Sequence, residues 1–276
     1  MSQILSGSAV AKALQAELKA RVDGLYLKYV FPVLATVRVG EDPSAVSYEN
    51  GLLRAAKATG VRVRRYIVPA DTEQTEIVKL IEQINADPLL SALLLLRPLP
   101  EGWDEDALTG LIDPAKDIDC VNLNHLPHFV PCTAEACMQI LRHYGIDPKG
   151  KHAVVLGRSR TAGLPSAKLL LEANATVTVC HSRTPDPAAH ARQADILIAA
   201  AGRRGLVREG WVKPGAVVLD VGIHRHPETG KLCGDVEFDA VSSAAGAITP
   251  VPGGVGAVTS TILMRHTIDA AERLAK

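Results

Sequence analysis

The chain has 276 residues, with 30 basic and 30 acidic side chains and a formal net charge of zero. A single hydrophobic core stops growing at about 250–300 residues, so this length fits two medium lobes better than one large domain. The balanced charge provides no source of non-specific attraction to nucleic acid. A small molecule is therefore the expected partner.

Neither export nor membrane insertion is expected. The longest apolar run, around residues 91–96, is far shorter than the roughly 18 residues that a spanning helix needs. The first residues lack the basic segment, apolar stretch and cleavage site of a secretion signal. The five cysteines are scattered and never spaced as metal ligands. We expect a soluble, cytoplasmic protein with reduced thiols and no metal site.

Short apolar runs alternate with longer stretches of helical period, which indicates an α/β fold with parallel sheets covered on both faces. Helices are expected at residues 7–26, 43–60, 72–86, 104–112, 133–144, 163–173, 187–193 and 260–274. Strands are expected at residues 33–39, 61–68, 92–96, 152–156, 176–180, 196–200 and 217–221. Thr72, Asp104 and Thr133 are candidate helix caps. The irregular segment 113–131 is a plausible domain boundary.

A turn with glycine at both ends, Gly157 and Gly163, follows the expected strand 152–156 and leads into a helix. Such a turn brings backbone N–H groups and a helix N-terminus up to a phosphate. Its spacing is not the usual dinucleotide-binding pattern, and a tight turn without ligand is the alternative interpretation.

The end of the next strand bears no acidic residue of the kind that bonds the ribose 2′-hydroxyl of NAD. Ser182 and Arg183 stand there instead, and a hydroxyl with a guanidinium suits the 2′-phosphate of NADP. NADP is therefore preferred over NAD. Arg183 taken singly is equally well explained as a solvated surface charge.

Several segments together resemble the methylenetetrahydrofolate dehydrogenase/cyclohydrolase family, over nearly the whole chain. They lie at residues 40–43, 48, 60–61, 97–100, 112–119, 129–133, 157–159, 180–184, 220–223 and 249–256. The last of these is highly specific, because an extended Pro/Gly-rich loop of that composition rarely arises merely as a turn.

The resemblance implies two α/β lobes joined by two long crossing helices, 133–144 and 260–274, and a homodimer formed through the NADP lobe. The first lobe would be residues 1–132, completed by the helix 260–276, and the Rossmann-like NADP lobe residues 133–259. The resemblance assigns NADP binding to Gly157, Arg158, Ser159, Ser182 and Ile223, and places a tetrahydrofolate derivative over the first lobe. It further implies hydride transfer to the nicotinamide, followed by ring opening with water.

This chain departs from the family pattern at two positions. Leu52 stands where the resemblance expects a lysine, one helical turn after Tyr48, and Leu96 stands where it expects a glutamine that positions this lysine. Ring opening by water needs a group that activates the water, and leucine offers none. Arg54 is expected on nearly the opposite helix face and Arg97 across the sheet, so neither is expected to replace the lysine.

Further departures indicate a remodelled folate pocket. Cys120 stands where the family has a glycine, Ala257 where it has a proline, and the loop 122–127 is shortened. Asp119 matches the aspartate that bonds the pterin ring, although Asp117 or Asp119 capping a turn is the alternative. Tyr48 is either a ligand-orienting residue or a packing residue.

The histidines are not assigned a catalytic or metal-binding part. His181 belongs to the nucleotide end by the resemblance and is interpreted as structural. The remaining candidates show no metal-ligand spacing, namely His125, His128, His224 and His226.

The sequence thus predicts an NADP-dependent oxidoreductase acting on methylenetetrahydrofolate, with Tyr48 and Asp119 orienting the ligand and with cyclohydrolase activity weak or lost. Hydride transfer survives such losses more readily, because the cofactor supplies the chemistry and the protein chiefly aligns the reactants. The alternatives are a non-catalytic paralogue that binds NADP and folate, or a specialised paralogue for which Leu52 and Leu96 form an apolar patch.

Overall fold

The computed structural model describes residues 2–122, 124 and 128–275, and the chain divides into two compact units. Unit 1 contains residues 1–11 and 133–259, and unit 2 contains residues 12–132 and 260–276. Two helices, α1 (Gly7–Tyr26) and α9 (Val255–Leu274), begin in unit 1 and end in unit 2. Among the described residues, no helix is long and apolar enough to cross a membrane.

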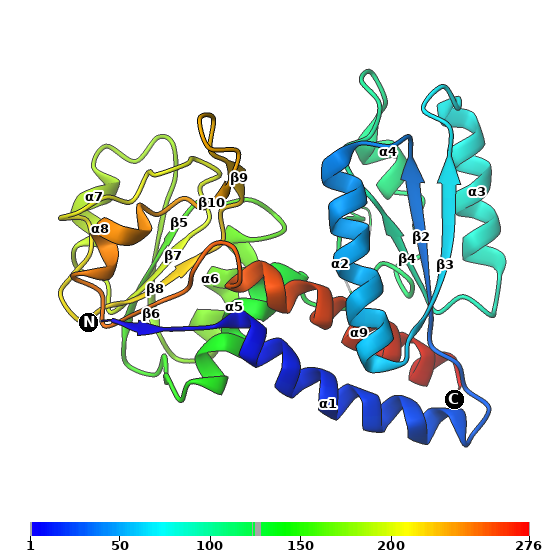
Figure 1. Ribbon diagram of the computed structural model, residues 1–276, viewed down its shortest axis with the longest axis horizontal. Coiled ribbons are helices and arrows are strands. Elements are labelled where there is room, and N and C mark those ends of the chain that lie inside the picture. The colour runs from blue at the N-terminus through cyan, green and yellow to red at the C-terminus, as the bar shows by residue number, and fades with distance from the viewer. Residues whose placement is uncertain (1, 123, 125–127, 276) are drawn as a thin grey trace. The chain divides into compact units, whose positions relative to one another are not determined.

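Unit 2 is built on a parallel sheet in the order β3 (Arg62–Val68), β2 (Val33–Val39), β4 (Ala92–Leu95). Alternate residues of β2 point to opposite faces. Ala35, Val37 and Val39 pack with the isoleucines of α3 (Gln74–Ala86). Thr36 and Arg38 hydrogen-bond to Glu49 of α2 (Pro43–Thr59) on the other face. The two helices flank the sheet in Figure 1.

Helix α2, which presents Tyr48, has clear signals at both ends. The carboxylate of Asp42 accepts the N–H groups of Ser44 and Ala45 at 2.8 and 3.2 Å, and Pro43 occupies the first helical position. Gly60 ends the helix in the left-handed conformation, at φ 82°. These caps explain why the expected helix 43–60 matches the observed one within a residue.

Of the three other expected caps, one is observed and two are not. Asp104 accepts the N–H of Ala107 at 2.9 Å and begins α4 (Glu105–Thr109), which confirms that prediction. The prediction for Thr72 was wrong, because α3 begins at Gln74 after Glu73, with no side-chain cap. Thr133 does not cap α5 (Cys132–His143) either, since it already lies inside the helix.

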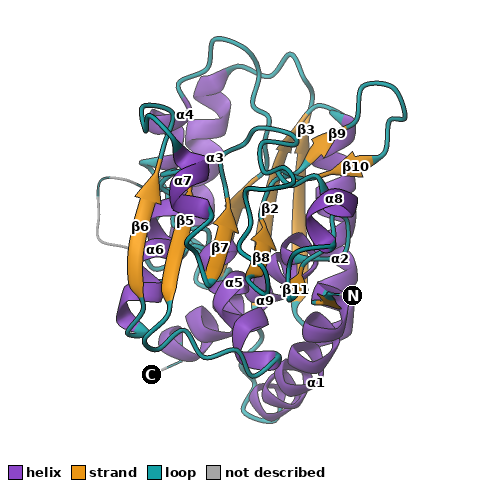
Figure 2. Ribbon diagram, turned by 90° about the vertical axis from the view of Figure 1, so that its left-hand side faces the viewer, coloured by secondary structure: helices purple, strands orange, loops and turns teal. Residues whose placement is uncertain are grey.

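Unit 1 contains a second parallel sheet, visible in Figure 2, in the order β1-β11-β8-β7-β5-β6. Its strands are β1 (Gln3–Ile4), β5 (His152–Leu156), β6 (Thr176–Cys180), β7 (Ile196–Ala199), β8 (Val217–Asp220) and β11 (Ala247–Ile248). The helices of this region are α6 (Gly163–Glu172), α7 (Pro187–Ala191) and α8 (Phe238–Ser242). The α/β class and the Rossmann-like second half are therefore confirmed.

An antiparallel hairpin of β9 (His224–Arg225) and β10 (Leu232–Cys233) also belongs to unit 1. The sequence did not indicate it, nor β1 or β11, because two-residue strands are too short to show a periodic pattern.

The chain start differs from expectation. Residues 1–11 belong to unit 1 and not to the first lobe, because β1 pairs with β11 and the N–H of Leu5 bonds to the carbonyl of Ile248 at 2.8 Å. Helix α9 begins at Val255, five residues before the expected start. There the N–H of Ala257 donates to the carbonyl of Gly254 at 3.0 Å, a bond that the proline expected from the resemblance could not make.

Candidate functional site

The glycine turn of unit 1 has a geometry that only glycine allows. Gly157 adopts φ 115°, and a Cβ there would lie 2.0 Å from the carbonyl oxygen of Ala200. A Cβ on Gly163 would lie 2.2 Å from the carbonyl oxygen of Gly157. The hydroxyl of Ser159 accepts the N–H of Gly163 at 3.3 Å. The strand, the turn and the start of α6 are thus held close together.

Beside this turn lies a cavity of about 370 Å³, which we call the nucleotide cavity. It is lined by Leu156, Gly157, Arg158, Ser159, Cys180, His181, Ser182, Thr184, Pro187, Ala200, Ala201, Arg203 and Leu206. These residues come from the carboxyl ends of β6, β5 and β7, which are neighbours in the sheet. Ligands bind at such an edge in parallel α/β sheets, and the hydroxyls and two arginines suit a phosphorylated nucleotide.

The structure does not bring all the predicted cofactor residues to this cavity. Gly157, Arg158, Ser159 and Ser182 line it, whereas Gly163 is not among the lining residues and packs against the backbone of Gly157. Arg183 is exposed and is not among the lining residues, and its backbone N–H donates to Nδ1 of His181 at 3.2 Å.

Ile223, the remaining predicted cofactor residue, is 62% exposed and also lies outside the lining. Sequence reasoning missed Thr184 and Arg203. Arg203 follows β7, and the strand order that brings β7 beside β5 was not readable from the sequence.

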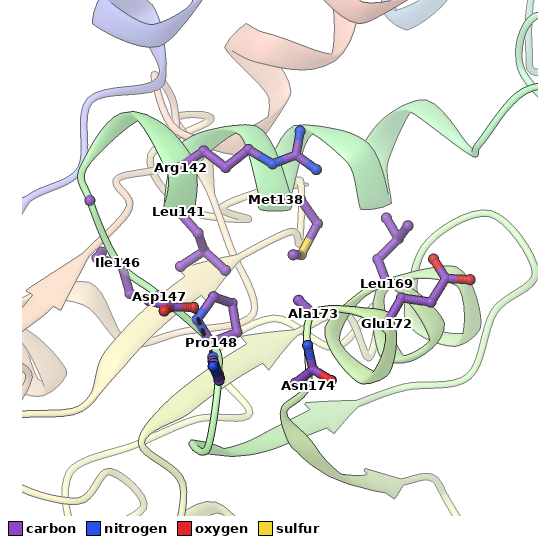
Figure 3. A pocket seen from close by; sticks show the side chains of 12 residues that line it. Met138, Leu141, Arg142, Ile146, Asp147, Pro148, Leu169, Glu172, Ala173 and Asn174 are labelled. Carbon is purple, nitrogen blue, oxygen red and sulfur yellow. Dashed lines mark hydrogen bonds between the residues drawn. The ribbon is translucent and has the colours of Figure 1, made fainter.

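A second cavity of unit 1, of about 580 Å³, is shown in Figure 3. Its lining includes Met138, Leu141 and Arg142 of α5, Leu169 and Glu172 of α6, and the segment 145–149 that precedes β5. This is the amino-end side of β5, away from the loops that follow the strands. It contains none of the predicted site residues, so we do not place the chemistry there.

In unit 2, Tyr48 and Asp119 share one electrostatic environment. Partial burial raises the pKa of Tyr48 well above its usual range, and the nearby Asp119 carboxylate raises it further. Burial also raises the pKa of Asp119, to about 6, although the guanidinium of Arg97 acts in the opposite direction. At neutral pH this pair offers a hydroxyl donor and a carboxylate acceptor.

Local contacts explain how Asp119 reaches this place. Residue Asp117 bridges to Leu93 of β4 in a parallel sense, so the chain runs along the strand towards its carboxyl end. The Asp117 carboxylate accepts the N–H groups of Val121 and Asn122 at 3.1 and 2.8 Å. Capping the turn is thus the role of Asp117, which leaves the Asp119 carboxylate for other partners.

Cys120 completes the turn in the left-handed conformation, at φ 57°. Glycine adopts this conformation without strain, which accounts physically for the glycine that the resemblance expects at this position. The backbone path beside Asp119 is therefore compatible with the family pattern although the side chain differs.

Arg97 does not point away from the site, so that part of the sequence analysis was wrong. Its Nη1 lies 4.0 Å from Oδ2 of Asp119, and its Nε lies 2.5 Å from Oε1 of Glu105. The alternation of a strand no longer applies, because β4 ends at Leu95 and Arg97 lies beyond it. The loop after β4, and not α2, therefore places a cation, the guanidinium of Arg97, beside Asp119.

The two leucines at the departing positions are core residues. Leu52 is fully buried and Leu96 is 2% exposed. They form no exposed apolar patch, so the structure gives no support to the alternative in which a different substrate packs on these two leucines. Arg54 is exposed, and its Nη2 lies 3.8 Å from the position of a Cβ on Gly51. His125 lies outside the described residues.

Comparisons with known proteins place these two regions in one family. Residues 5–119 match the model of the tetrahydrofolate dehydrogenase/cyclohydrolase catalytic domain, and residues 131–275 match that of its NAD(P)-binding domain. The bifunctional protein FolD of Moorella thermoacetica is 46% identical over 279 residues, covering 99% of each chain. That of Variovorax paradoxus is 44% identical over 282 residues, covering 100% of this chain and 99% of the relative.

Solved structures of FolD enzymes are also similar to this chain over its full length. The FolD enzyme of Campylobacter jejuni superposes with a TM-score of 0.93 at 37% identity, covering 99% of each chain. The enzyme of Trypanosoma brucei, solved with NADP and an inhibitor, gives 0.92 at 40% identity, covering 100% of this chain and 99% of that one.

Proposed function

Because the chain belongs to the tetrahydrofolate dehydrogenase/cyclohydrolase family, we propose that it is an NADP-dependent methylenetetrahydrofolate dehydrogenase with weak or lost cyclohydrolase activity. The loss of cyclohydrolase activity is proposed above all because Leu52 and Leu96, both buried, stand where the resemblance expects a lysine and a glutamine.

The proposed ligand contacts in unit 2 use the two groups with perturbed ionisation. Asp119, ionised at neutral pH, accepts hydrogen bonds from adjacent donors of a pterin ring. Tyr48 stays protonated and donates its hydroxyl hydrogen to the ligand. The two side chains thereby orient the folate.

The charges of the site favour hydride loss. NADP, when bound, would supply the acceptor for a hydride from the methylene carbon, and loss of that hydride would leave positive charge on the folate. Arg97, Glu105 and Asp119 together carry a net charge of −1 when ionised, since one guanidinium faces two carboxylates. A fixed negative environment stabilises a developing cation.

Ring opening by water lacks an activating group in this arrangement. The raised pKa of Tyr48 keeps its hydroxyl protonated, and an arginine does not accept protons near neutral pH. Asp119 is committed to the ligand in this proposal. Leu52 and Leu96 contribute neither proton transfer nor charge stabilisation.

The two half-reactions, assayed separately on the purified chain, test this function. We expect reduction of NADP with methylenetetrahydrofolate and release of the methenyl product without enzymatic hydrolysis. Prompt hydrolysis of added methenyltetrahydrofolate would contradict the loss of cyclohydrolase activity. Absence of NADP reduction would contradict the dehydrogenase.

The cofactor preference can be tested with two arginines. NADP is proposed to lie in the nucleotide cavity, with Arg158 beside its 2′-phosphate, because Arg158 lines that cavity and Arg183 does not. Arg158→Gln should weaken NADP binding about tenfold, as expected for one lost hydrogen bond to a charged group, and leave NAD binding nearly unchanged. Arg183→Gln is the matched control. Calorimetric titration measures both, and a larger effect at Arg183 would favour the sequence-based assignment.

The pH dependence of the reaction should report the ionisation of Asp119. Its pKa of about 6 predicts that kcat/KM falls as the pH drops below about 6, because the carboxylate becomes protonated. Arg97→Leu removes a cation that favours the carboxylate, so this acid limb should move to higher pH, and Arg97→Lys should restore it. An unchanged limb in Arg97→Leu would separate Arg97 from the function of Asp119.

The oligomeric state and cellular setting complete the proposal. We propose a homodimer formed through unit 1, whose sheet ends at β6, a strand with one open edge among the described residues. We also propose that the protein works in the cytoplasm, where cysteine thiols stay reduced.

A further inference from the structure

A buried carboxylate in unit 1, that of Asp235, is not used by the proposed chemistry. Asp235 is fully buried and lies two residues after the end of β10. Its Oδ2 accepts the N–H groups of Ala201 and Gly202 at 2.7 and 2.9 Å. Its Oδ1 lies 2.7 Å from Nε2 of His224. One carboxylate therefore joins the loop after β7 to the hairpin β9–β10.

Both ends of this connection lie at sites assigned to the cofactor. Ala201 lines the nucleotide cavity, as do its neighbours Ala200 and Arg203. His224 directly follows Ile223, the residue that the resemblance assigns to NADP binding. The segment before His224 is tightly packed against Asp235, because a Cβ on Gly222 would lie 2.4 Å from Oδ1 of Asp235. A shift of the Asp235 carboxylate would therefore move both segments.

We propose that His224 is a positioning residue for the cofactor, acting through Asp235 on the loop 200–203 and on Ile223. The imidazole donates from Nε2 to a carboxylate whose other hydrogen bonds among the described residues come from backbone amides. Without this bond, a buried oxygen would be left without its partner, and the carboxylate would lose the fixed position from which it holds two backbone amides.

Asp220 has a separate role and does not replace this connection. Its carboxylate accepts the N–H groups of Gly222, Asp235 and Val236 at 2.9–3.0 Å, and so it fixes the backbone around Asp235 and not the Asp235 side chain. The carboxylate of Asp220 faces that of Asp235 as a like charge. Among the described residues, the side-chain hydrogen bond to the Asp235 carboxylate comes from the partly exposed His224.

Amide hydrogen exchange tests the contact directly, without any ligand. In His224→Ala, exchange at Ala201 and Gly202 should quicken by about tenfold, because their acceptor is less firmly held. His224→Gln keeps an N–H donor and should restore most of the protection. His226→Ala is the matched control: this residue lies next to β9 in the same hairpin, and its Nδ1 accepts the N–H of Glu228 at 3.3 Å, not a bond from or to Asp235. It should leave Ala201 and Gly202 unchanged.

A second readout rests on the proposed use of NADP. His224→Ala should raise the dissociation constant for NADP by about tenfold and leave the KM for the folate nearly unaltered, with rescue by His224→Gln. Failure of the unaltered protein to bind NADP would count against the proposed function, while the exchange experiment would still decide this inference. Unchanged exchange at Ala201 and Gly202 in His224→Ala, or equal acceleration in His226→Ala, would overturn it.

Discussion

The double variant Leu52→Lys, Leu96→Gln is expected to hydrolyse methenyltetrahydrofolate about 10² to 10⁴ times faster than the natural chain, the usual contribution of a positioned acid or base. Leu52 lies one helical turn after Tyr48, so a lysine there extends from the same face of α2. A glutamine at residue 96 supplies the amide that the resemblance pairs with this lysine. Hydrolysis is measured as the loss of the absorbance of methenyltetrahydrofolate.

The control for this experiment is Leu52→Met, Leu96→Met, which keeps an apolar side chain of similar volume at both positions. It should fold well and show no gain in hydrolysis. The lysine variant should lose stability, because Leu52 is fully buried and an ammonium group is costly there. A folded lysine variant without any gain would show that the site lacks more than these two side chains.

Replacing Glu49 by alanine is expected to lower the free energy of unfolding of the protein by about 3–5 kcal/mol, as for other broken buried ion pairs. The Glu49 carboxylate is almost fully buried between α2 and the sheet. It accepts hydrogen bonds from Thr36 at 3.1 Å, from Arg38 at 3.0 Å and from Arg65 at 2.9 and 3.1 Å. In Glu49→Ala, the buried guanidinium of Arg38 would lose this carboxylate partner.

Denaturant unfolding measures this loss, with Glu82→Ala as the control, since Glu82 is exposed on α3. A loss no larger than that of the control would show that the network does not stabilise the fold. The effect should also depend on pH. Burial alone would raise the pKa of Glu49, but the bonds from Arg65, Thr36 and Arg38 hold it below its usual value.

A lowered pKa in the folded state means that the ionised Glu49 stabilises the protein above the pKa of the unfolded chain, about 4.3. This contribution is lost as the pH falls through the lower folded value. The natural chain should therefore lose stability in acid more steeply than Glu49→Ala. Glu49 directly follows Tyr48, the residue proposed to orient the ligand, on α2.

Much of this molecule was determined by local sequence signals. The helix α2 is specified by Asp42, Pro43 and Gly60, and the strands 33–39, 152–156 and 176–180 have the bounds expected from their apolar runs. The glycine turn at residues 157–163 was identified from its two glycines, because a Cβ at Gly157 or Gly163 would lie 2.0–2.2 Å from a backbone carbonyl oxygen. Such features depend on residues that are neighbours in the chain.

What only the tertiary structure decided are the contacts between distant segments. Strand order placed both Arg203 and Arg158 in the lining of the nucleotide cavity, and Arg97, beyond the end of β4 at Leu95, lies near Asp119. The His224–Asp235 contact likewise depends on a hairpin too short for any periodic pattern. The sequence determines which groups are present, whereas their partners and protonation depend on burial and on charges that only the folded chain brings within a few ångströms.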